Sequence, residues 1–303
     1  MNDADRRLIE RCPVGCTAAL GPTDIALPEG ALLRCGECGQ LTSQIGADAY
    51  ARSLKRFDAA EFNRPTERET ARRRHVAHRR LARVVRLLGK PAAQCQLVDV
   101  GCSRGDFVAF AQDFGFVAEG VEPAPQIAAD ARAAGRNVKT GVLEEQSYPE
   151  ASFDCVTLFE VIEHLPAPLG LLAECRRILK PGGVLLLSTG NAASWTARVL
   201  EGRWDYFRID KDAGHVSFFN PGSLALAAER AGFAVARIDT ARVRFAEKGD
   251  VPAAVYAAAK AAGELTSGVA RLLGRGHDMV AYLRPLPRRR EGMRVSASPA
   301  GTR

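Results

Sequence analysis

The chain has 303 residues, of which 47% are hydrophobic and 25% are charged, a balance that fits one globular α/β domain with a small appendage. No uncharged apolar run approaches the roughly 18–20 residues that a membrane-spanning helix needs, and the first residues, MNDADRRLIERC, lack a signal-peptide core. We therefore expect a cytoplasmic protein without a membrane partner.

The formal net charge of +7 is concentrated in an Arg-rich stretch at residues 68–90 and in the tail at 285–303, which we expect to be disordered. Basic patches can bind nucleic acid or acidic surfaces, and they can also be solvated faces with no partner. No aromatic residue for base stacking is interleaved with the arginines of the first stretch, which favours a solvated face there.

Two close cysteine pairs near the N-terminus predict a metal site. They are Cys12-Pro-Val-Gly-Cys16 and Cys35-Gly-Glu-Cys38, separated by a segment with turn signals suited to a β-hairpin. Four thiolates in this arrangement are typical of structural zinc, with no coordination position left open. The pattern predicts a zinc ribbon over residues 1–45, to which the metal supplies folding energy. An iron–sulfur site or chance spacing is the alternative.

Residues 46–94 are predicted to be a helical linker. Thr66 and Glu69 have the spacing of a capping box, and an apolar stripe runs from Ala77 to Leu88 before Gly89 ends the helix.

Strands and helices alternate over residues 95–284. The expected strands are 96–100, 117–122, 137–140, 153–159, 184–188, 233–238 and 279–283, and the expected helices are 106–114, 126–134, 168–179 and one between Pro221 and Gly232. This alternation predicts a doubly wound, mostly parallel, seven-stranded Rossmann-like sheet. Residues 190–219 and 250–276 are read as insertions, the second of them helical and rich in alanine.

A glycine turn, Gly101-Cys102-Ser103-Arg104-Gly105, lies where the first of these strands passes into the first helix. Glycine lets the backbone approach a ligand closely, and the helix N-terminus offers amides to an anion. Glu122 ends the next strand, where a carboxylate can accept hydrogen bonds from ribose hydroxyls. Together the turn and the acid predict a nucleoside pocket.

Two other sites share part of this pattern. A dinucleotide fold needs G-x-G-x-x-G, and the spacing of Gly101, Ser103 and Gly105 is different. The segment also matches the G-x-S-x-G nucleophile elbow, with Asp154 and a later histidine in the right order. In that hydrolase fold the elbow follows several strands and a preceding HGGG segment, and neither is found here.

The chain resembles class I methyltransferases of the group that includes quinone-ring O-methyltransferases and many bacterial glycan-cluster enzymes. The segments that carry the resemblance are residues 97–105, 120–122, 152–154, 159–165, 178–183 and 214–221. One departure is Ser103, which stands where the family has the middle glycine of its turn.

The resemblance implies a cofactor, S-adenosylmethionine, and a set of residues that would bind it. By position they are Asp99 for orienting the turn, Gly101, Ser103 and Gly105 for close approach, Glu122 for the ribose, Glu144 for the adenine and Phe159 for the methionine portion. Asp99 and Phe159 could instead be a buried acid and a core aromatic residue.

His164 and His215 are the candidate catalytic residues, because His75 and His78 lie on the Arg-rich helix and His277 has no evident partner. Some relatives use a matching E-x-x-E-H motif with a downstream histidine to bind a divalent ion. Glu160, Glu163, His164 and His215 could hold such an ion, for instance magnesium. In other relatives the Glu-His pair caps a helix or orients a loop.

The resemblance favours O-methylation of a small-molecule or glycan hydroxyl. Trp195, Trp204, Tyr206 and Phe207 in the first insertion are expected to form an aromatic lid over the acceptor. An RNA methyltransferase, suggested by the zinc ribbon and the basic helix, is the second interpretation, and a non-catalytic cofactor-binding scaffold is the third.

Overall fold

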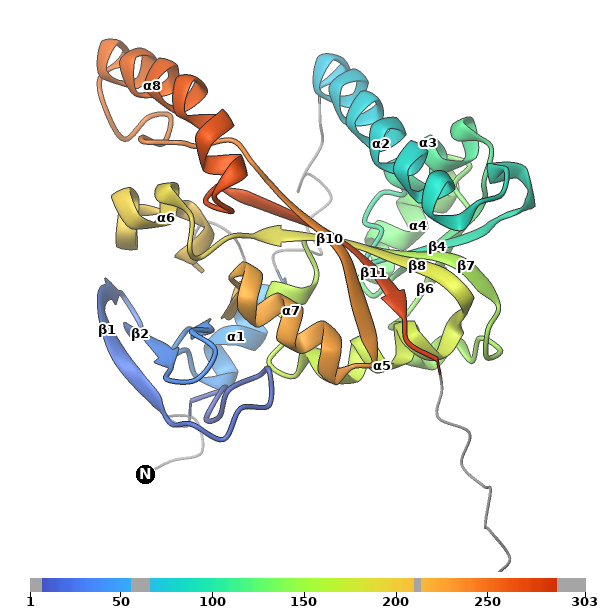
Figure 1. Cartoon of the computed structure of the whole chain (residues 1–303), viewed down its shortest axis with the longest axis horizontal. Coiled ribbons are helices and arrows are strands. Elements are labelled where there is room, and N and C mark those ends of the chain that lie inside the picture. Colours follow the sequence, from blue (N-terminus) through green and yellow to red (C-terminus); the bar gives the residue numbers. More distant parts are fainter. Residues whose placement is uncertain (1–6, 56–65, 210–213, 288–303) are drawn as a thin grey trace, which may run out of the picture.

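The computed structural model describes residues 7–55, 66–209 and 214–287. The expected disorder of the tail therefore lies, beyond Leu286 and Pro287, outside the described residues. Strands of the described parts form a seven-stranded and a four-stranded sheet, and the larger sheet runs through the middle of the molecule (Figure 1). No helix within the described ranges is long and apolar enough to cross a bilayer.

The larger sheet confirms the predicted fold class. Its strands, in spatial order, are β10 (Phe233–Ala241), β11 (Asp278–Pro285), β8 (Leu179–Gly190), β7 (Phe153–Phe159), β4 (Gln96–Val100), β5 (Val117–Glu122) and β6 (Val138–Thr140). The five strands from β8 to β6 pair in parallel, and β11 runs antiparallel to both of its neighbours. The order reverses between β4 and β7, and in sheets of this kind the carboxyl ends of the strands at such a point are where ligands bind.

Helices cover both faces of this sheet (Figure 1). On one face lie α2 (Glu67–Leu88), α3 (Asp106–Phe114) and α4 (Pro125–Ala133), and on the other α5 (Pro168–Ile178) and α7 (Pro221–Arg230). Adjacent residues of β4 point to opposite faces, so Leu97 belongs to the core under α2 and α3, whereas Val98 belongs to the core under α5 and α7.

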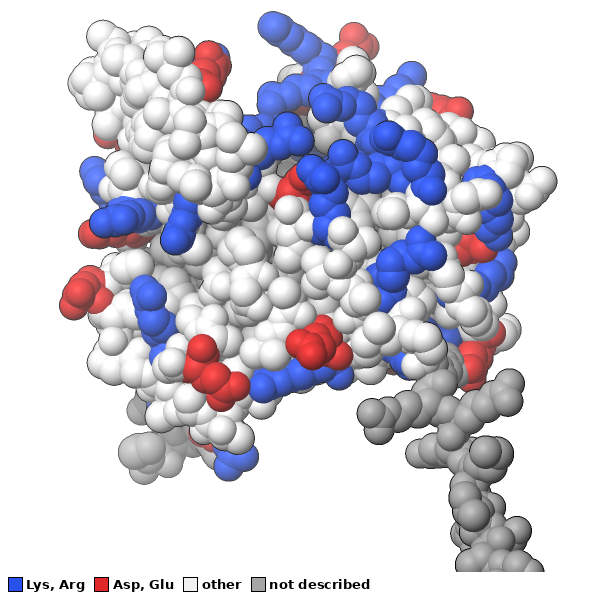
Figure 2. All heavy atoms as spheres, in the orientation of Figure 1, with Lys and Arg blue, Asp and Glu red and all other residues white. Residues whose placement is uncertain are grey.

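The long helix α2 begins and ends as the sequence predicts. The Thr66 side chain and Glu69 form a reciprocal capping box, and Gly89 closes the helix in the left-handed conformation. Ala77, Leu81 and Val84 are buried. The opposite face carries the arginines, which gather over α2 in the space-filling view (Figure 2).

The expected start of the fifth strand is wrong. Strand β8 begins at Leu179 and not at Val184, because Leu179 already pairs with Phe153 and the Lys180 ammonium binds the Asp154 carboxylate at 2.9 Å. The Pro-Gly-Gly segment therefore lies inside the strand, where the pairing register shifts.

The N-terminal residues form the smaller, antiparallel sheet of β1 (Leu20–Leu27), β2 (Gly30–Cys35) and β3 (Leu41–Thr42), followed by α1 (Ala47–Leu54). Its fourth strand is β9 (Ser217–Phe218), which comes from the first insertion of the main domain. The predicted domain boundary at residue 45 is thus bridged by strand pairing. We call the described residues 7–54 the cysteine module.

The first insertion contains α6 (Trp195–Leu200) and packs against the cysteine module. Trp204, Tyr206 and Phe207 are buried together with Leu32 and Phe218. The expected lid of aromatic rings over an acceptor is therefore wrong for these three residues, because their rings form a core between the two sheets. Only Trp195 is partly exposed.

The second insertion is the helix α8 (Ala253–Leu272), as expected, and it projects from the body of the molecule (Figure 1). Gly263 permits its approach to the chain after β10, since a Cβ there would lie 2.4 Å from the Val243 carbonyl oxygen.

Candidate functional site

The glycine turn between β4 and α3 is fixed to the neighbouring strand by backbone bonds. The amides of Gly101 and Cys102 both donate to the Val121 carbonyl, at 2.8 and 3.1 Å. Gly101, Ser103 and Gly105 all have positive φ, 70°, 49° and 72°. Ser103 therefore adopts a left-handed conformation that costs a non-glycine residue conformational energy, as the departure from the family's glycine implies.

Glu122 lies directly against this turn. Its carboxylate is buried and accepts hydrogen bonds from the Ser103 amide at 2.7 Å and from the Ala124 amide at 2.9 Å. The structure thus brings together the two features on which the nucleoside pocket was predicted, at the carboxyl ends of β4 and β5.

Asp99 faces β7. It is buried, and the Thr157 hydroxyl donates to its carboxylate at 2.5 Å. Burial raises the pKa of Asp99 to about 7, and the charge of Glu122 adds to this shift. Its role in orienting the turn stays a prediction.

Phe159 ends β7 and stacks edge-on against Phe107 of α3, with ring centroids 4.5 Å apart. The guanidinium of Arg80, from α2, lies 5.2 Å from the centroid of the Phe159 ring. Burial lowers the pKa of Arg80, and no residue that the structure describes forms a hydrogen bond or ion pair with it. Sequence reasoning missed Arg80 among the arginines of α2, although its spacing of three and four residues from buried Ala77 and Val84 places it at the edge of the buried face.

Glu144 lies in a short 3-10 helix, Leu143–Gln146, and is exposed. Its expected position near an adenine ring stays a prediction.

The loop after β7 carries the E-x-x-E-H segment and adjoins the glycine turn. A Cβ added to Gly101 would lie 2.6 Å from a methyl carbon of Val161, so only glycine fits under this loop. The glycine turn and the E-x-x-E-H loop are therefore in contact.

Glu163 and His164, in this loop, come together with His215. One ligand atom from each lies within 4.8 Å of the others, and the two imidazole centroids are 4.6 Å apart. Nε2 of His215 is 3.9 Å from Oε1 of Glu163. Three of the four predicted metal-binding residues are thus grouped.

Glu160 is not part of this group. It is exposed, has a φ of 54° and accepts a hydrogen bond from the Ser188 hydroxyl at 2.8 Å. The Glu160 carboxyl group lies against that of Glu163 and influences its pKa, but of the two acids only Glu163 groups with both histidines.

Burial controls the charge of the grouped residues. It raises the pKa of Glu163 well above its usual range, assisted by the Glu160 charge, and it lowers the pKa of His215 to about 3. Oε2 of Glu163 accepts from the Thr189 hydroxyl at 2.9 Å. Oε1 has no hydrogen-bond partner among the described residues. A buried oxygen of this kind usually has a partner, so Oε1 is available to a ligand or ion.

Tyr206 completes the surroundings of His215. The Tyr206 ring lies 4.3 Å from the His215 ring, centroid to centroid, and its carbonyl oxygen is 3.0 Å from Nδ1 of His215. Its hydroxyl accepts from the Gly190 amide at 2.7 Å. Nδ1 is held by the backbone in this way, so Nε2 is the nitrogen of His215 that faces Glu163.

The three remaining histidines lie elsewhere. His75 and His78 are on α2, as expected. The expectation that His277 has no partner is wrong, because its ring is buried 5.3 Å from the Trp204 ring and its Nε2 lies 3.4 Å from the Asp278 carboxylate.

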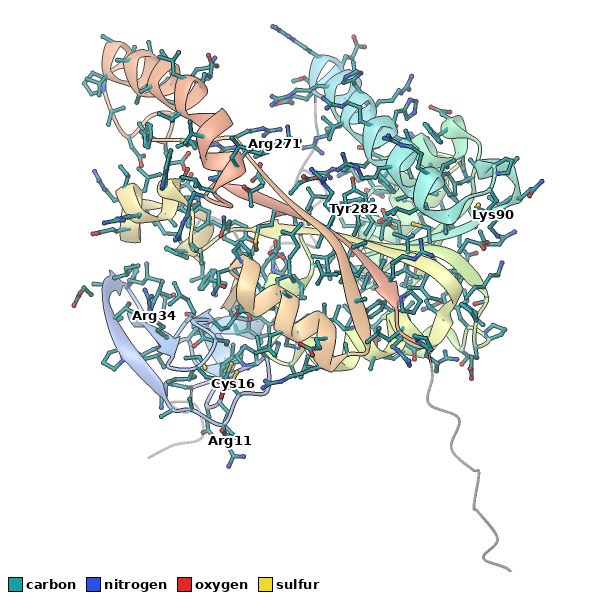
Figure 3. The ribbon with its side chains drawn as sticks, viewed as in Figure 1. Arg11, Cys16, Arg34, Lys90, Arg271 and Tyr282 are labelled. Atoms are coloured by element: carbon teal, nitrogen blue, oxygen red, sulfur yellow. The ribbon has the colours of Figure 1, made fainter. Side chains whose placement is uncertain are left out.

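The sulfur atoms of Cys12, Cys16, Cys35 and Cys38 all lie within 4.8 Å of one another. Those of Cys12 and Cys38 are 3.6 Å apart, close to the separation of about 3.8 Å that two thiolates have around tetrahedral zinc with bonds of about 2.3 Å. Figure 3 shows the labelled Cys16 beside α7. Arg230 of α7 donates to the Val14 carbonyl at 2.7 Å and to the Cys16 sulfur at 3.4 Å.

Residues 71–238 match the family model described as a methyltransferase domain. The chain belongs to this family. The resemblance to class I methyltransferases is therefore confirmed.

Two curated relatives carry the name ubiquinone biosynthesis O-methyltransferase. The protein from Thiobacillus denitrificans is 29% identical over 152 residues, which cover 47% of this chain and 66% of the relative. The protein from Xanthomonas axonopodis is 30% identical over 152 residues, which cover 46% and 63%. The chain thus spans less than two thirds of the length of these relatives.

Solved structures of methyltransferases are similar to the chain at lower identity. A SAM-dependent methyltransferase from Archaeoglobus fulgidus has a TM-score of 0.49 and 20% identity, covering 70% of this chain and 94% of that one. The 1,6-didemethyltoxoflavin-N1-methyltransferase of Burkholderia thailandensis has a TM-score of 0.49 and 17% identity, covering 90% and 97%.

Proposed function

We propose that this protein transfers a methyl group from S-adenosylmethionine to a hydroxyl of a small molecule or glycan. The observation that carries the proposal is the position of Glu122 against the glycine turn, at the point where the strand order of the sheet reverses. A buried carboxylate at this point suits the two hydroxyls of a ribose.

The residues at the turn fit such a cofactor. Glu122 would accept bonds from the ribose, the left-handed turn of Gly101, Ser103 and Gly105 would lie along the methionine portion, and Phe159 would pack beside it. Arg80 adds a cation without a carboxylate partner among the described residues, and its guanidinium lies over the Phe159 ring. We assign it to the methionine carboxylate, since a guanidinium binds a carboxylate through charge-assisted hydrogen bonds.

The cofactor, when bound, supplies a methyl group on a positively charged sulfur. The protein then has to orient the acceptor in line with that bond and to take up the proton of its hydroxyl. The candidate for the second task is His215, because Nε2 of its imidazole faces Glu163 at 3.9 Å. Burial lowers its pKa to about 3, which keeps the ring neutral but makes it a weak base, so this role requires that bound substrates raise that pKa.

Glu163, His164 and His215 would alternatively hold a divalent ion that binds the acceptor oxygen. The oxygen of Glu163 that lacks a partner among the described residues supports this role. Two imidazoles and one carboxylate suit zinc, manganese or iron better than magnesium, which prefers oxygen ligands. We therefore propose a transition metal, and not magnesium, as the ion, with Glu163, His164 and His215 as its ligands and Glu160 outside the ligand set.

The acceptor class rests on the relatives, which are named as O-methyltransferases. Because Trp204 and Phe207 are buried, their rings cannot stack on a sugar or aryl acceptor. A hydroxyl on a small molecule is consistent with the neutral, buried surroundings of His215, where a nearby proton acceptor has little competition from water.

We further propose that the four cysteines bind structural zinc. Their sulfur atoms all lie within 4.8 Å of one another, close enough to surround one ion, and the cysteine module has little core of its own.

The proposed activity is tested first on the cofactor. Calorimetric titration of the full chain should show binding of S-adenosylhomocysteine in the micromolar range and none of NAD. Tight binding of NAD without any response to the sulfonium cofactor or its product would contradict the proposal.

A further inference from the structure

The cysteine module is hydrogen-bonded to the segment that carries His215. Strand β3 pairs with β9, Thr42 opposite Ser217, and the next amide, of Ser43, donates to the Val216 carbonyl at 3.0 Å. The Val216 amide in turn donates to the Glu163 carbonyl at 2.9 Å. Val216, the neighbour of His215, is therefore held between the cysteine module on one side and the E-x-x-E-H loop on the other.

A side-chain bond strengthens this connection. Nε2 of Gln40 donates to the Ser217 hydroxyl at 3.0 Å, and both residues are fully buried. A buried polar side chain that loses its partner costs about 1–3 kcal/mol, so this pair favours a single register of β3 against β9.

The module also reaches the second histidine. The Tyr50 hydroxyl, on α1, donates to the backbone carbonyl of His164 at 2.5 Å. Each of the two histidine-bearing segments is thus bound by a different part of the same N-terminal module.

The cysteine turns lead directly into these contacts. In the second turn the Cys35 amide donates to the Gln40 carbonyl at 2.9 Å, which places Gln40 at the start of β3. The Cys38 carbonyl accepts from the side chain of Asn220, the cap of α7, at 3.3 Å. A metal bound by Cys35 and Cys38 would therefore fix the backbone from which Gln40, Thr42 and Ser43 bind β9.

We infer that the cysteine module is a positioning element of the active site. Metal binding at the four cysteines sets the relative position of His164 and His215, and Gln40 and Tyr50 are the positioning residues that transmit it. The contacts described above end on the histidine segments and on α7, so loss of the metal disturbs the acceptor side and leaves the cofactor side in place. The catalytic meaning of this inference rests on the proposed function, whereas the geometric coupling does not.

The coupling is measured without an acceptor, by heteronuclear NMR of the imidazole groups in the full chain labelled at its five histidines. In the double variant Cys35→Ser/Cys38→Ser, zinc content should fall to near zero, and the signals of His164 and His215 should shift or broaden. His75 and His78 on α2 serve as internal references and should keep their signals, and the affinity for S-adenosylhomocysteine should stay within about threefold.

Two milder variants keep the metal. Tyr50→Phe should move the His164 signals, and Gln40→Leu should move those of His215, each with unchanged zinc content. Tyr256→Phe on α8 is the matched control and should move neither. If the double variant fails to fold, as loss of the His78 signal would show, these two variants decide the question.

Unchanged His164 and His215 signals in the folded, zinc-free double variant would overturn the inference, as would unchanged signals in both Tyr50→Phe and Gln40→Leu. Return of the native signals when zinc is added back to chelator-treated wild-type protein would support it. Failure of the wild-type chain to bind S-adenosylhomocysteine would instead refute the proposed function and leave the histidine readout intact.

Discussion

The imidazoles of His164 and His215 lie with their centroids 4.6 Å apart and their planes inclined at 58°. The His215 ring is neutral near pH 7, because burial and the neighbouring His164 lower its pKa to about 3. A neutral imidazole beside a protonated or metal-bound Glu163 can take up a proton or bind an ion, and the two roles make different predictions.

If Glu163, His164 and His215 hold an ion, Glu163→Gln should abolish turnover on the identified acceptor, and chelator should do the same until a transition metal is added. Glu160→Gln is the comparison within the motif. Glu160 lies outside the group, so this variant should keep the metal dependence, although turnover can change because Glu160 influences the pKa of Glu163. Equal losses in both variants would show that the spacing of the motif, and not the observed grouping, defines the ligand set.

If His215 is a general base, His215→Ala should lower kcat by about 10²–10⁴ and leave cofactor affinity unchanged, because His215 lies on the acceptor side. Chelator should then have no effect on the wild-type enzyme. Near-normal turnover of His215→Ala would exclude both roles and leave His215 as a packing partner of Tyr206.

Glu122→Ala should weaken binding of S-adenosylhomocysteine by roughly 1–3 kcal/mol, as loss of charged hydrogen bonds to a ribose would. Calorimetry measures the change. Glu119→Ala on the same strand is the control and should have little effect, because Glu119 pairs with Lys139 at the surface.

Arg80→Ala should weaken S-adenosylhomocysteine by about 10–100-fold, since it removes a charge-assisted bond to the methionine carboxylate. Methylthioadenosine lacks this carboxylate, so its affinity should change little in the same variant. The exposed neighbour in Arg79→Ala is the control. An equal loss for both ligands would assign Arg80 to packing on Phe159 and not to the carboxylate.

Elemental analysis should find about one zinc per chain, and none after Cys12→Ser/Cys16→Ser. The isolated, buried thiol of Cys175 is the control, and Cys175→Ala should keep the metal. A disulfide within the four-cysteine group, or protein purified without chelator that contains no zinc, would contradict the assignment.

His277 makes the free energy of unfolding depend on pH. Burial lowers its pKa to about 4 in the folded chain, against about 6.5 when unfolded. Between these values the unfolded state binds the extra proton, so stability is fully present above about pH 6.5 and falls toward pH 4, by roughly 3 kcal/mol in all.

Urea unfolding at pH 7.5 and 4.5 should therefore show a smaller loss of stability in His277→Gln than in the wild type. His75→Gln, at an exposed position on α2, should behave as the wild type. An unchanged pH dependence in His277→Gln would mean that other groups account for the acid lability.

The elements of the cofactor side could be predicted from sequence because they follow local rules. The bounds of β4, α3, β5 and β7 agree with the predictions, since each is set by hydrophobic periodicity and by glycines that end helices within a few residues. Gly101 follows β4 and Glu122 ends β5, and consecutive parallel strands bring their carboxyl ends to one edge of the sheet. The four cysteines were likewise identifiable by their spacing.

Tertiary structure alone decided which of the remaining polar and aromatic residues form the site. Trp204 and Phe207 look like lid residues in a polar insertion, yet they are buried because β9 joins the N-terminal sheet and leaves no other core for that insertion. Arg80 differs from the exposed Arg79 beside it in being partly buried, with its guanidinium over the Phe159 ring.

Glu160 and Glu163 belong to the same motif, yet only Glu163 groups with the two histidines, and Glu160 has a left-handed backbone conformation. Periodicity reports which face of an element is buried, but not what lies against it. The pairing of residues 40–43 with 216–218, and with it the position of His215, depends on contacts between segments far apart in the chain.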